Sequence, residues 1–536
     1  MNRRRSIQLL ACSLGGVFLM RCGMRGSRPF TVKLSGASAE RGHRLRAAHV
    51  FQPIRSQEVE VIIVGAGVAG LSTARTLRSN GVDDLLVLDL EDRAGGNARS
   101  GSNAYGAFPL GAHYLPVPEP KDEPLLQFLR ECGVITGTAA DGSPIYNEEH
   151  LCGDPHERLF HRGQWRSGLR PRSGQTNEEE QQFVRFEERV AEFGLRKGTD
   201  GRWAFAIPVD DSSMADDTAD VRALDDVTFA AWLSQEGFDT QPLMWYLDYA
   251  CMDDLGAPAS QVSAWAGLHY FAARRGHGSN AETGSILTWP EGNGFLVNGL
   301  LRSSADRVRT GTLVRSVGIE DDHVQVDVSD MATGEDVRYR ASHVVLAVPQ
   351  FVVARLLGGE HVQRSSGMEY APWIVVNLTL DRAPIDRGGE PMAWDNVLFG
   401  SASLGYVNAG HQRLDRAPGM ILTHYRALTG RSPRQAREQA SGVEVAQWVE
   451  DAVQELERVH PDLRDRLVEA EVAIWGHGMI VPVPGTIHGP QRRTLRDPLA
   501  DRIHFAHSDL SGISLFEEAF HHGLRAAREV LDRRKA

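Results

Sequence analysis

The stretch VIIVGAGVAGLS, from Val61 to Ser72, constrains the fold of this chain more than any other feature. Four apolar residues lead directly into three closely spaced glycines, and a helical pattern of apolar residues follows. This order is typical of a buried parallel strand, a tight turn and the N-terminus of a helix. Because the first N–H groups of a helix have no partner within it, such a turn can bind a phosphate group. The sequence therefore predicts an α/β fold with a pyrophosphate at its first βα turn.

The three glycines follow the spacing G-x-G-x-x-G. Gly65 would form the turn, Gly67 would let a phosphate approach the backbone, and Gly70 would let the helix pack closely on the strand. The next buried strand, LLVLDL, contains Asp89, 19 residues after Gly70, where a carboxylate can accept hydrogen bonds from both ribose hydroxyls. The pattern predicts a dinucleotide site, and the alternative is a tight turn without a ligand. The residues predicted to form the turn of this site are Gly65, Gly67, Val68, Ala69 and Gly70.

The residues that follow, DLEDRAGGNARSG, identify the dinucleotide more closely. They resemble the D-R-x-G-G-R signature of the flavin-containing amine oxidase and phytoene desaturase superfamily. Asp92, Arg93, Gly95 and Gly96 match this signature, and Asn97 stands where the family has an arginine that reaches the cofactor. The resemblance implies that the cofactor is FAD.

Further segments resemble the same family in the same order. LGAHYLP resembles the loop that passes the flavin ring, and GTLVRSV resembles the strand whose valine, here Val314, contacts adenine through its backbone. Near the C-terminus, Asp509 matches an acid that meets the ribityl and phosphate region, while His507 and Glu518 replace family glycines. The FAD-binding residues that the resemblance implies beyond the first turn are Asp89, Arg93, Gly95, Gly96, Asn97, Gly111, Ala112, Val314 and Asp509.

The resemblance also suggests residues on the substrate side of the flavin. Trp475 falls where the family has an aromatic residue near the flavin, and His477 follows it by two positions. The alternative is a core tryptophan with a surface histidine. His113, beside the flavin loop, is a candidate for tuning the ring, with a structural hydrogen bond as the alternative.

Lysine is scarce in this chain, and this bears on the substrate. Many amine oxidases of the superfamily place a lysine on a central strand of the substrate sheet, near the flavin. That strand is here PWIVVNLTL, with Val376 or Asn377 at the equivalent position, and the only lysines of the chain are Lys33, Lys121, Lys197 and Lys535. Amine oxidation does not strictly require the lysine, because the flavin carries the chemistry.

The segment MWYLDYACMDDLGAPASQVSAWAGLHYFA is rich in aromatic residues and acids. We interpret it either as the lining of a pocket for a cationic ligand or as packed helices. No metal site is predicted, because the neighbouring His521 and His522 cannot share a helix face and the cysteines lack C-x-x-C spacing. A formal charge of −12 and a pI near 5.9 also argue against nucleic acid as a partner.

The N-terminus has the pattern of an export signal. Arg3, Arg4 and Arg5 precede an apolar stretch from Ile7 to Met20, which is shorter than the ~20 residues that a membrane-spanning helix needs. The consecutive arginines suit a twin-arginine signal, so we expect a periplasmic protein without a stable transmembrane span in its mature form. Lipid attachment at Cys12 or Cys22, an uncleaved membrane anchor and a wrongly chosen start codon are the alternatives.

We therefore expect an FAD-dependent oxidoreductase with a discontinuous Rossmann-type domain and an α+β substrate domain, as in amine oxidases. It would transfer a hydride from a substrate C–H bond, next to nitrogen, to flavin N5, with O₂ or a periplasmic electron carrier as acceptor. The alternatives are a desaturase or isomerase of an apolar polyene or terpenoid, and a flavoprotein with a structural or redox-sensing FAD. The expected segments are an export signal (1–27), a linker (28–56), three parts of the FAD-binding domain (57–118, 285–350 and 495–536), and a mostly helical part (119–284) and a sheet-containing part (351–494) of the substrate domain.

Overall fold

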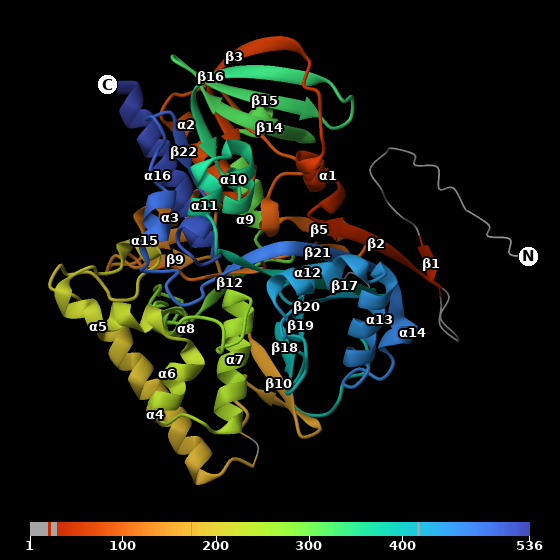
Figure 1. Cartoon of the computed structure of the whole chain (residues 1–536). Coiled ribbons are helices and arrows are strands. Elements are labelled where there is room, and N and C mark those ends of the chain that lie inside the picture. Colours follow the sequence, from red (N-terminus) through yellow and green to blue (C-terminus); the bar gives the residue numbers. More distant parts are fainter. Residues whose placement is uncertain (1–19, 23–28, 173, 415–418, 536) are drawn as a thin grey trace, which may run out of the picture.

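The computed structural model describes residues 20–22, 29–172, 174–414 and 419–535. They form two lobes, each built around one large sheet (Figure 1). In the first lobe, five strands run parallel in the order β13 (Val308–Arg309), β4 (Leu85–Leu88), β3 (Pro53–Val64), β16 (Asp336–Leu346) and β22 (Ile503–Phe505). The first half of β16 also pairs antiparallel with β15 (Val324–Asp330), which pairs with β14 (Thr312–Ile319).

Two helices pack against each other beside this first sheet. They are α2 (Val68–Ser79) and the C-terminal helix α16 (Phe516–Lys535). Residues 61 to 64 of β3 are all buried, which agrees with a central strand that is covered on both faces. The strands come from separate parts of the chain, so the sheet of the first lobe forms only when these distant segments meet.

The second lobe is built on a nine-stranded sheet. Its inner strand β17 (Glu369–Leu380) pairs antiparallel with β21 (Leu467–Val481) on one side and β20 (Met420–Ala427) on the other. The outer strands are β1 (Met20–Cys22), β2 (Phe30–Gly36), β19 (Tyr406–Asn408), β18 (Asp395–Leu398), β10 (Glu157–His161) and β11 (Gln164–Ser167).

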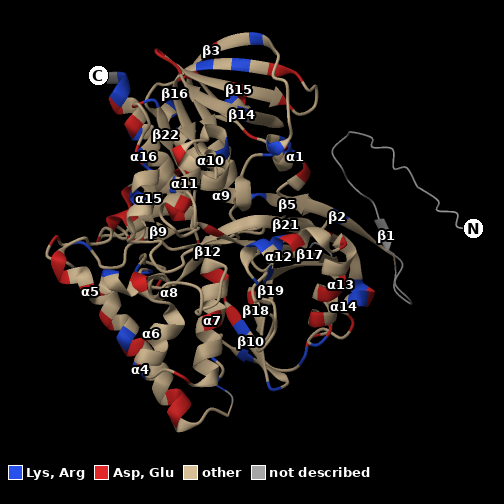
Figure 2. Ribbon diagram, viewed as in Figure 1, with Lys and Arg blue, Asp and Glu red and all other residues tan. Residues whose placement is uncertain are grey.

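Helices cover both faces of this second sheet. On one face, α12 (Pro433–Gly442), α13 (Val445–Leu456) and α14 (Leu463–Arg466) form one group, and Val376 of β17 packs in the same cluster as residues of α13. On the other face, Trp373 and Val375 pack with the helical lobe, which contains α4 (Asn177–Leu195), α6 (Phe229–Gln235), α7 (Gln241–Leu255) and α8 (Ala264–Ala272). Charged residues gather along α4, α13, α14 and α16 (Figure 2).

The remaining helices and strands are shorter. The helices are α3 (Glu123–Glu131), α5 (Ala219–Arg222), α9 (Gly294–Leu301), α10 (Gln350–Leu357), α11 (Glu360–Arg364) and α15 (Pro490–Leu495). The strands are β5 (Ser100–Asn103), β6 (Gly106–Pro109), β7 (Tyr114–Pro116), β8 (Ile135–Thr138), β9 (Pro144–Tyr146) and β12 (Ile286–Thr288). Within the described ranges, every helix is too short or too polar to cross a lipid bilayer.

The segment 28–56, which we expected to be a linker, is instead largely folded. Its strand β2 pairs in parallel with β21, and Phe30 and Val32 are buried in the alternating pattern of a half-buried strand. The helix α1 (Ala39–His43) follows, and residues 44–46 then contact β14 of the other lobe. We call residues 30–46 the bridging segment, because they run from the second sheet to the first lobe (Figure 1). The predicted export signal, 1–27, lies outside the described residues except for β1.

Candidate active site

The glycines of the first turn differ in what surrounds them. Gly65 has a φ of +103°, and a Cβ atom at this position would overlap the carbonyl oxygen of Ala347. At Gly70, a Cβ atom would overlap the carbonyl oxygen of Gly65. Gly67 is different, because the nearest heavy atom to its Cβ position is the Cα of Gly96 at 3.9 Å. Two of the glycines are therefore required by packing, and the third leaves open space beside the backbone.

This open space lies at the N-terminus of α2. Gly67 is the N-cap residue and provides no side-chain hydrogen bond to the first turn, which contains Val68 and Ala69. The N–H of Gly95 donates to the carbonyl of Ala66 at 2.7 Å, so the loop after β4 packs over the same turn. The first N–H groups and the positive end of the helix dipole therefore form a site that suits an anion such as a diphosphate.

Asp89 and Val314 lie at the ribose and adenine end of the predicted site. Asp89 Oδ2 accepts a hydrogen bond from the Ala66 N–H at 2.6 Å, and Oδ1 accepts from the Glu91 N–H at 2.9 Å. Burial raises the pKa of Asp89, and these two N–H groups oppose the rise. Thr312, two residues before Val314 on β14, donates from its N–H to the Asp89 carbonyl at 2.8 Å, so this strand passes beside the acid.

The bridging segment contacts the same loop from outside. Glu91 Oε1 accepts a hydrogen bond from the Ser38 N–H at 2.9 Å, and the guanidinium of Arg41 lies 3.9 Å from the Glu91 carboxylate. Arg99 donates to the Gly36 carbonyl at 2.8 Å. The N-terminal residues therefore form an outer wall next to the predicted ribose site, which the polar sequence of this segment did not suggest.

Two further predicted FAD residues, Asp509 and Arg93, have different surroundings. Asp509 is buried near the N-terminus of α10, where it accepts hydrogen bonds from the Gln350 N–H at 2.9 Å and from the Tyr370 hydroxyl at 2.6 Å. Although burial opposes ionisation, the nearby His507 and these two donors lower the pKa of Asp509. Arg93 is exposed, and its guanidinium donates a hydrogen bond to the Ser100 carbonyl of β5 at 3.4 Å.

A cavity of about 150 Å³ lies between the loop 110–116, β21 and the N-terminus of α16. Its wall includes four of the predicted site residues that precede the helical lobe, namely Asn97, Gly111, Ala112 and His113. Trp475 joins them from β21, where its indole N–H donates to the Leu110 carbonyl at 2.6 Å. The structure therefore brings Asn97, the flavin loop and the predicted aromatic residue to one place.

The two predicted histidines have different positions. The ring of His113 stacks on Tyr425 with 4.4 Å between centroids, and burial lowers its pKa to about 4, so it is neutral at pH 7. His477 is not part of the cavity wall and stacks instead on Phe351 at 4.2 Å. The cause is a bulge in β21: Trp373 pairs with Trp475 and Ala371 with Met479, so the extra residues of β21 turn His477 away from the cavity.

Residues that sequence reasoning did not place complete the wall. Trp373 and Val375 of β17 face the cavity, whereas Val376 and Asn377, which we expected at the family's lysine position, do not line it. Asn377 instead donates to the Pro109 carbonyl at 3.0 Å. Because neighbouring residues of a strand point to opposite faces, Val376 packs on the side of α13, whereas Asn377 stands on the same face as Val375 without lining the cavity.

Charged side chains concentrate at one end of the cavity. Asp253, Asp254, Arg274 and Glu517 all belong to its wall. The guanidinium of Arg274 lies 2.5 Å from Asp254 and neutralises it. Burial raises the pKa of Asp253 to about 7 and that of Glu517 to about 7. The wall therefore carries more carboxylates than cations, and the two unpaired ones can stabilise a positively charged ligand.

Two buried polar atoms of the wall have no hydrogen-bond partner among the described residues. They are Asn293 Oδ1 and the indole nitrogen of Trp373. Leaving such atoms unpaired costs free energy, so a ligand in this cavity would be stabilised by pairing with them. Together with the N-terminus of α2, where Gly67 offers no side-chain cap, these atoms are groups with which a bound FAD would pair.

The aromatic and acidic segment of the helical lobe both lines the cavity and packs in the core, so each of its two expected roles is filled by some of its residues. Asp253 and Asp254 reach the cavity, whereas Trp265 is fully buried and stacks on Phe205 at 5.0 Å, in the core. Within the described ranges, no three side chains of His, Cys, Asp or Glu are grouped so as to hold a metal ion.

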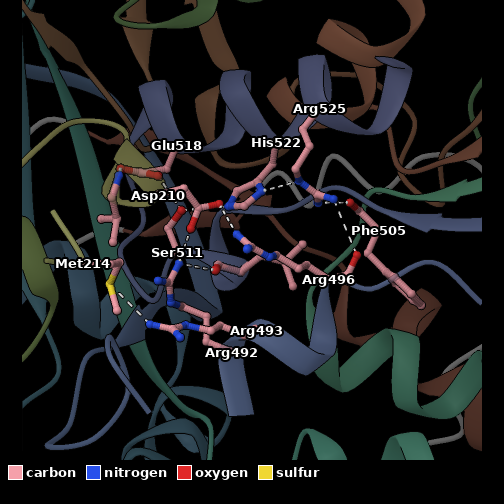
Figure 3. A network of polar contacts seen from close by, with 12 residues as sticks. Asp210, Met214, Arg492, Arg493, Arg496, Phe505, Ser511, Glu518, His522 and Arg525 are labelled. Carbon is pink, nitrogen blue, oxygen red and sulfur yellow. Dashed lines mark hydrogen bonds and ion pairs between the residues drawn. The ribbon is translucent and has the colours of Figure 1, made fainter. Parts of the chain in front are cut away.

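Glu518, which replaces a family glycine, belongs to a buried network that Figure 3 shows. Its carboxylate accepts a hydrogen bond from the Val209 N–H at 2.8 Å and contacts the Ser511 hydroxyl. That hydroxyl lies 2.8 Å from His522 Nε2, and neighbouring Asp210 forms ion pairs with Arg492 and Arg496. The network therefore connects α16 with residues 209–211 of the helical lobe and with α15.

Comparison with known proteins agrees with this geometry. A family model described as flavin containing amine oxidoreductase matches residues 68–531. Wild-type putrescine oxidase bound to putrescine is similar with 17% identity and a TM-score of 0.63, and cyclohexylamine oxidase from Brevibacterium oxydans IH-35A with 15% and 0.62. Each alignment covers 89% of this chain and 100% of the other. The likenesses confirm the predicted fold class.

Proposed function

Since the chain belongs to the family of flavin-containing amine oxidoreductases and is an FAD-dependent oxidoreductase, we propose that it oxidises an amine at a C–H bond next to the nitrogen. One observation carries this proposal beyond the family. The cavity beside the flavin loop has aromatic walls and carboxylates, including Asp253 and Glu517, that have no cationic partner among the described residues. Such a cavity suits a protonated amine and not an apolar polyene.

The residues that would hold FAD come from both lobes. The N–H groups after Gly67 would bind the diphosphate, Asp89 would accept the ribose hydroxyls, and Asp509 would lie toward the ribityl chain. When bound, FAD supplies two-electron oxidation by accepting a hydride at N5. The protein then has to bind the amine, orient it and exclude water.

The cavity residues can perform these tasks. The carboxylates attract the ammonium form of the amine, and the imidazole of His113 is neutral, so it can accept a hydrogen bond from it. The bound ammonium first releases a proton to solvent, and loss of a hydride from the free amine then leaves an iminium ion. Trp373 and Trp475 exclude water from the reacting carbon while the hydride leaves. After release from the cavity, water hydrolyses the iminium ion to a carbonyl compound and a smaller amine or ammonia.

The cellular setting is part of the same proposal. The arginines and apolar stretch of residues 3 to 20 support export of the folded protein to the periplasm, with O₂ or a periplasmic electron carrier as acceptor. Replacing the arginine pair Arg4 and Arg5 by lysines should keep the protein in the cytoplasm, as measured by cell fractionation. An unchanged periplasmic fraction would contradict export by the twin-arginine route.

The reaction is tested by product analysis. The leaderless, FAD-loaded protein is incubated with primary amines, amino acids and a polyene, with O₂ and separately with an artificial electron acceptor. We expect carbonyl product and ammonia from the amine class and unchanged polyene. Conversion of the polyene alone would favour the desaturase, and no conversion of any compound with either acceptor would contradict a catalytic role.

A further inference from the structure

The indole ring of Trp475 is contacted at its edge and on its face by the two residues that flank the hairpin of β5 and β6. At the edge, the indole N–H donates to the Leu110 carbonyl at 2.6 Å. Over the face, the guanidinium carbon of Arg99 lies 5.3 Å from the ring centroid, where the π electrons attract a cation. The N–H of Leu110 also donates to the Arg99 carbonyl at 3.0 Å, so the two residues are themselves bonded together.

The guanidinium of Arg99 lies behind the cavity wall. Trp475 lines the cavity and Arg99 does not, and the Arg99 side chain is only 6% exposed. A buried cation needs acceptors, and Arg99 has them on three sides. Its Nε donates to the Gly96 carbonyl at 3.2 Å, Nη2 donates to the Gly36 carbonyl at 2.8 Å, and Nη1 lies 3.9 Å from the Glu91 carboxylate. These partners fix the plane of the guanidinium, because its donors form a rigid fork.

One of these acceptors belongs to the bridging segment. Gly36 ends β2, which lies beside β21, and it pairs with Ile474, the residue before Trp475 (Figure 1). The φ of Gly36 is +92°, and a Cβ atom at this position would overlap the carbonyl oxygen of Ile474. The close approach of the two strands therefore brings the Gly36 carbonyl within reach of Arg99. The cation that contacts the indole is held in place by a segment that precedes the first βα turn.

The two contacts restrict the indole in different ways. A hydrogen bond at one edge, as with the Leu110 carbonyl, would still let the ring of Trp475 tilt about that bond. A guanidinium over the ring removes this freedom, because tilting would separate the cation from the π electrons. The cavity is about 150 Å³, and Trp475 is one of its large walls, so a tilted ring would change the shape that a ligand meets.

We propose that Arg99 is a positioning residue for the substrate, because it holds the indole of Trp475 in the orientation in which the cavity binds the amine. This assignment rests on the proposed amine oxidation. Arg99 acts through the ring and does not touch the substrate. Without Arg99, the loosened ring would lose part of its attraction for the substrate ammonium, which corresponds to roughly a 3- to 30-fold lower kcat/KM.

The first test is a double-mutant cycle that does not depend on turnover. Wild type, Arg99→Met, Trp475→Leu and the double variant are loaded with excess FAD, and tetramethylammonium is titrated into each by calorimetry. With Trp475 present, Arg99→Met should weaken binding at least about threefold, and in the Trp475→Leu background it should leave binding unchanged. Equal losses in both backgrounds would overturn the proposal, because a merely structural role of Arg99 does not depend on the indole.

Two further variants complete this test. Arg185→Met is the matched control, since Arg185 also lies over an aromatic ring, that of Phe238 at 4.9 Å, and donates to the Glu236 carbonyl at 2.8 Å, but lies outside the cavity wall. It should bind the probe like the wild type. If Arg99→Met folds poorly, Arg99→Lys takes its place in the cycle, because one ammonium nitrogen cannot replace the fork of the guanidinium.

The second test uses steady-state kinetics with an amine that the protein oxidises. Arg99→Met should raise KM at least about threefold and change kcat less than KM, because the residue acts on binding. A lower kcat with an unchanged KM would overturn the proposal. Probe binding that depends on Arg99 only when Trp475 is present, without oxidation of any amine, would contradict the proposed function and still support the effect of Arg99 on the cavity.

Discussion

Replacing Gly67 by alanine should weaken FAD binding without disturbing the fold. The backbone at Gly67 has φ −76° and ψ −176°, which alanine adopts without strain. An added Cβ atom would meet only the Cα of Gly96 at 3.9 Å, an ordinary contact. At Gly70, by contrast, the Cβ atom would overlap the Gly65 carbonyl oxygen. Gly67→Ala should therefore fold, and Gly70→Ala should not fold normally.

The added methyl group would nevertheless occupy the space that a diphosphate needs at the N-terminus of α2. If it moves the phosphate away from one N–H group after Gly67, one charge-assisted hydrogen bond is lost, about 1.5–3 kcal/mol. This corresponds to an FAD dissociation constant weaker by roughly 10- to 100-fold. The effect requires that the phosphate lies at this turn, so it tests the position of the cofactor directly.

The assay is titration of the flavin-free protein with FAD, followed by flavin fluorescence, together with the melting temperature of the flavin-free protein. Gly67→Ala should melt like the wild type and bind FAD more weakly, whereas Gly70→Ala should melt at a clearly lower temperature. Wild-type FAD affinity in Gly67→Ala would refute the placement of the diphosphate. A melting temperature as low as that of Gly70→Ala would refute the open space beside Gly67.

Three further predictions concern the surroundings of the site. Arg41→Ala removes the contact of the bridging segment with Glu91, so flavin should dissociate several-fold faster after dilution than in the exposed control Arg44→Ala; equal rates would contradict this role. Trp475→Phe loses one buried hydrogen bond and should lower the free energy of unfolding by about 1 kcal/mol in urea denaturation. Burial raises the pKa of Glu518 to about 7 from 4.5, so its stabilising contribution is complete below pH 4.5 and is lost as the pH rises through 7. The stability of Glu518→Gln relative to wild type should therefore rise by up to about 3 kcal/mol over that range, and a flat difference would contradict the shift.

The sequence predicted the parts of the fold that depend on local spacing. G-x-G-x-x-G with an acid after the next strand specified a strand, a turn and a helix, and the family match confirms the predicted family and FAD as cofactor. Trp475 was predicted to lie near the flavin because it occupies the same place along the chain as an aromatic residue of the family. The bridging segment was not predicted, because polar residues separate its few apolar ones and its strand β2 is stabilised by pairing with the distant strand β21.

The side-chain positions that differ from the sequence-based expectation are set by pairings between distant strands. His477 was expected beside Trp475, but the bulge of β21 opposite Ala371 turns it away. Val375, and not Val376, faces the cavity, because strand register is set by packing on both sheet faces.

The most direct test of the account is the visible absorbance of the leaderless protein, followed without oxygen while amines are added. We expect a yellow protein whose flavin absorbance is bleached by an amine. A yellow protein that no amine bleaches would contradict amine oxidation, and a colourless protein that takes up no FAD would contradict the cofactor site at the first turn.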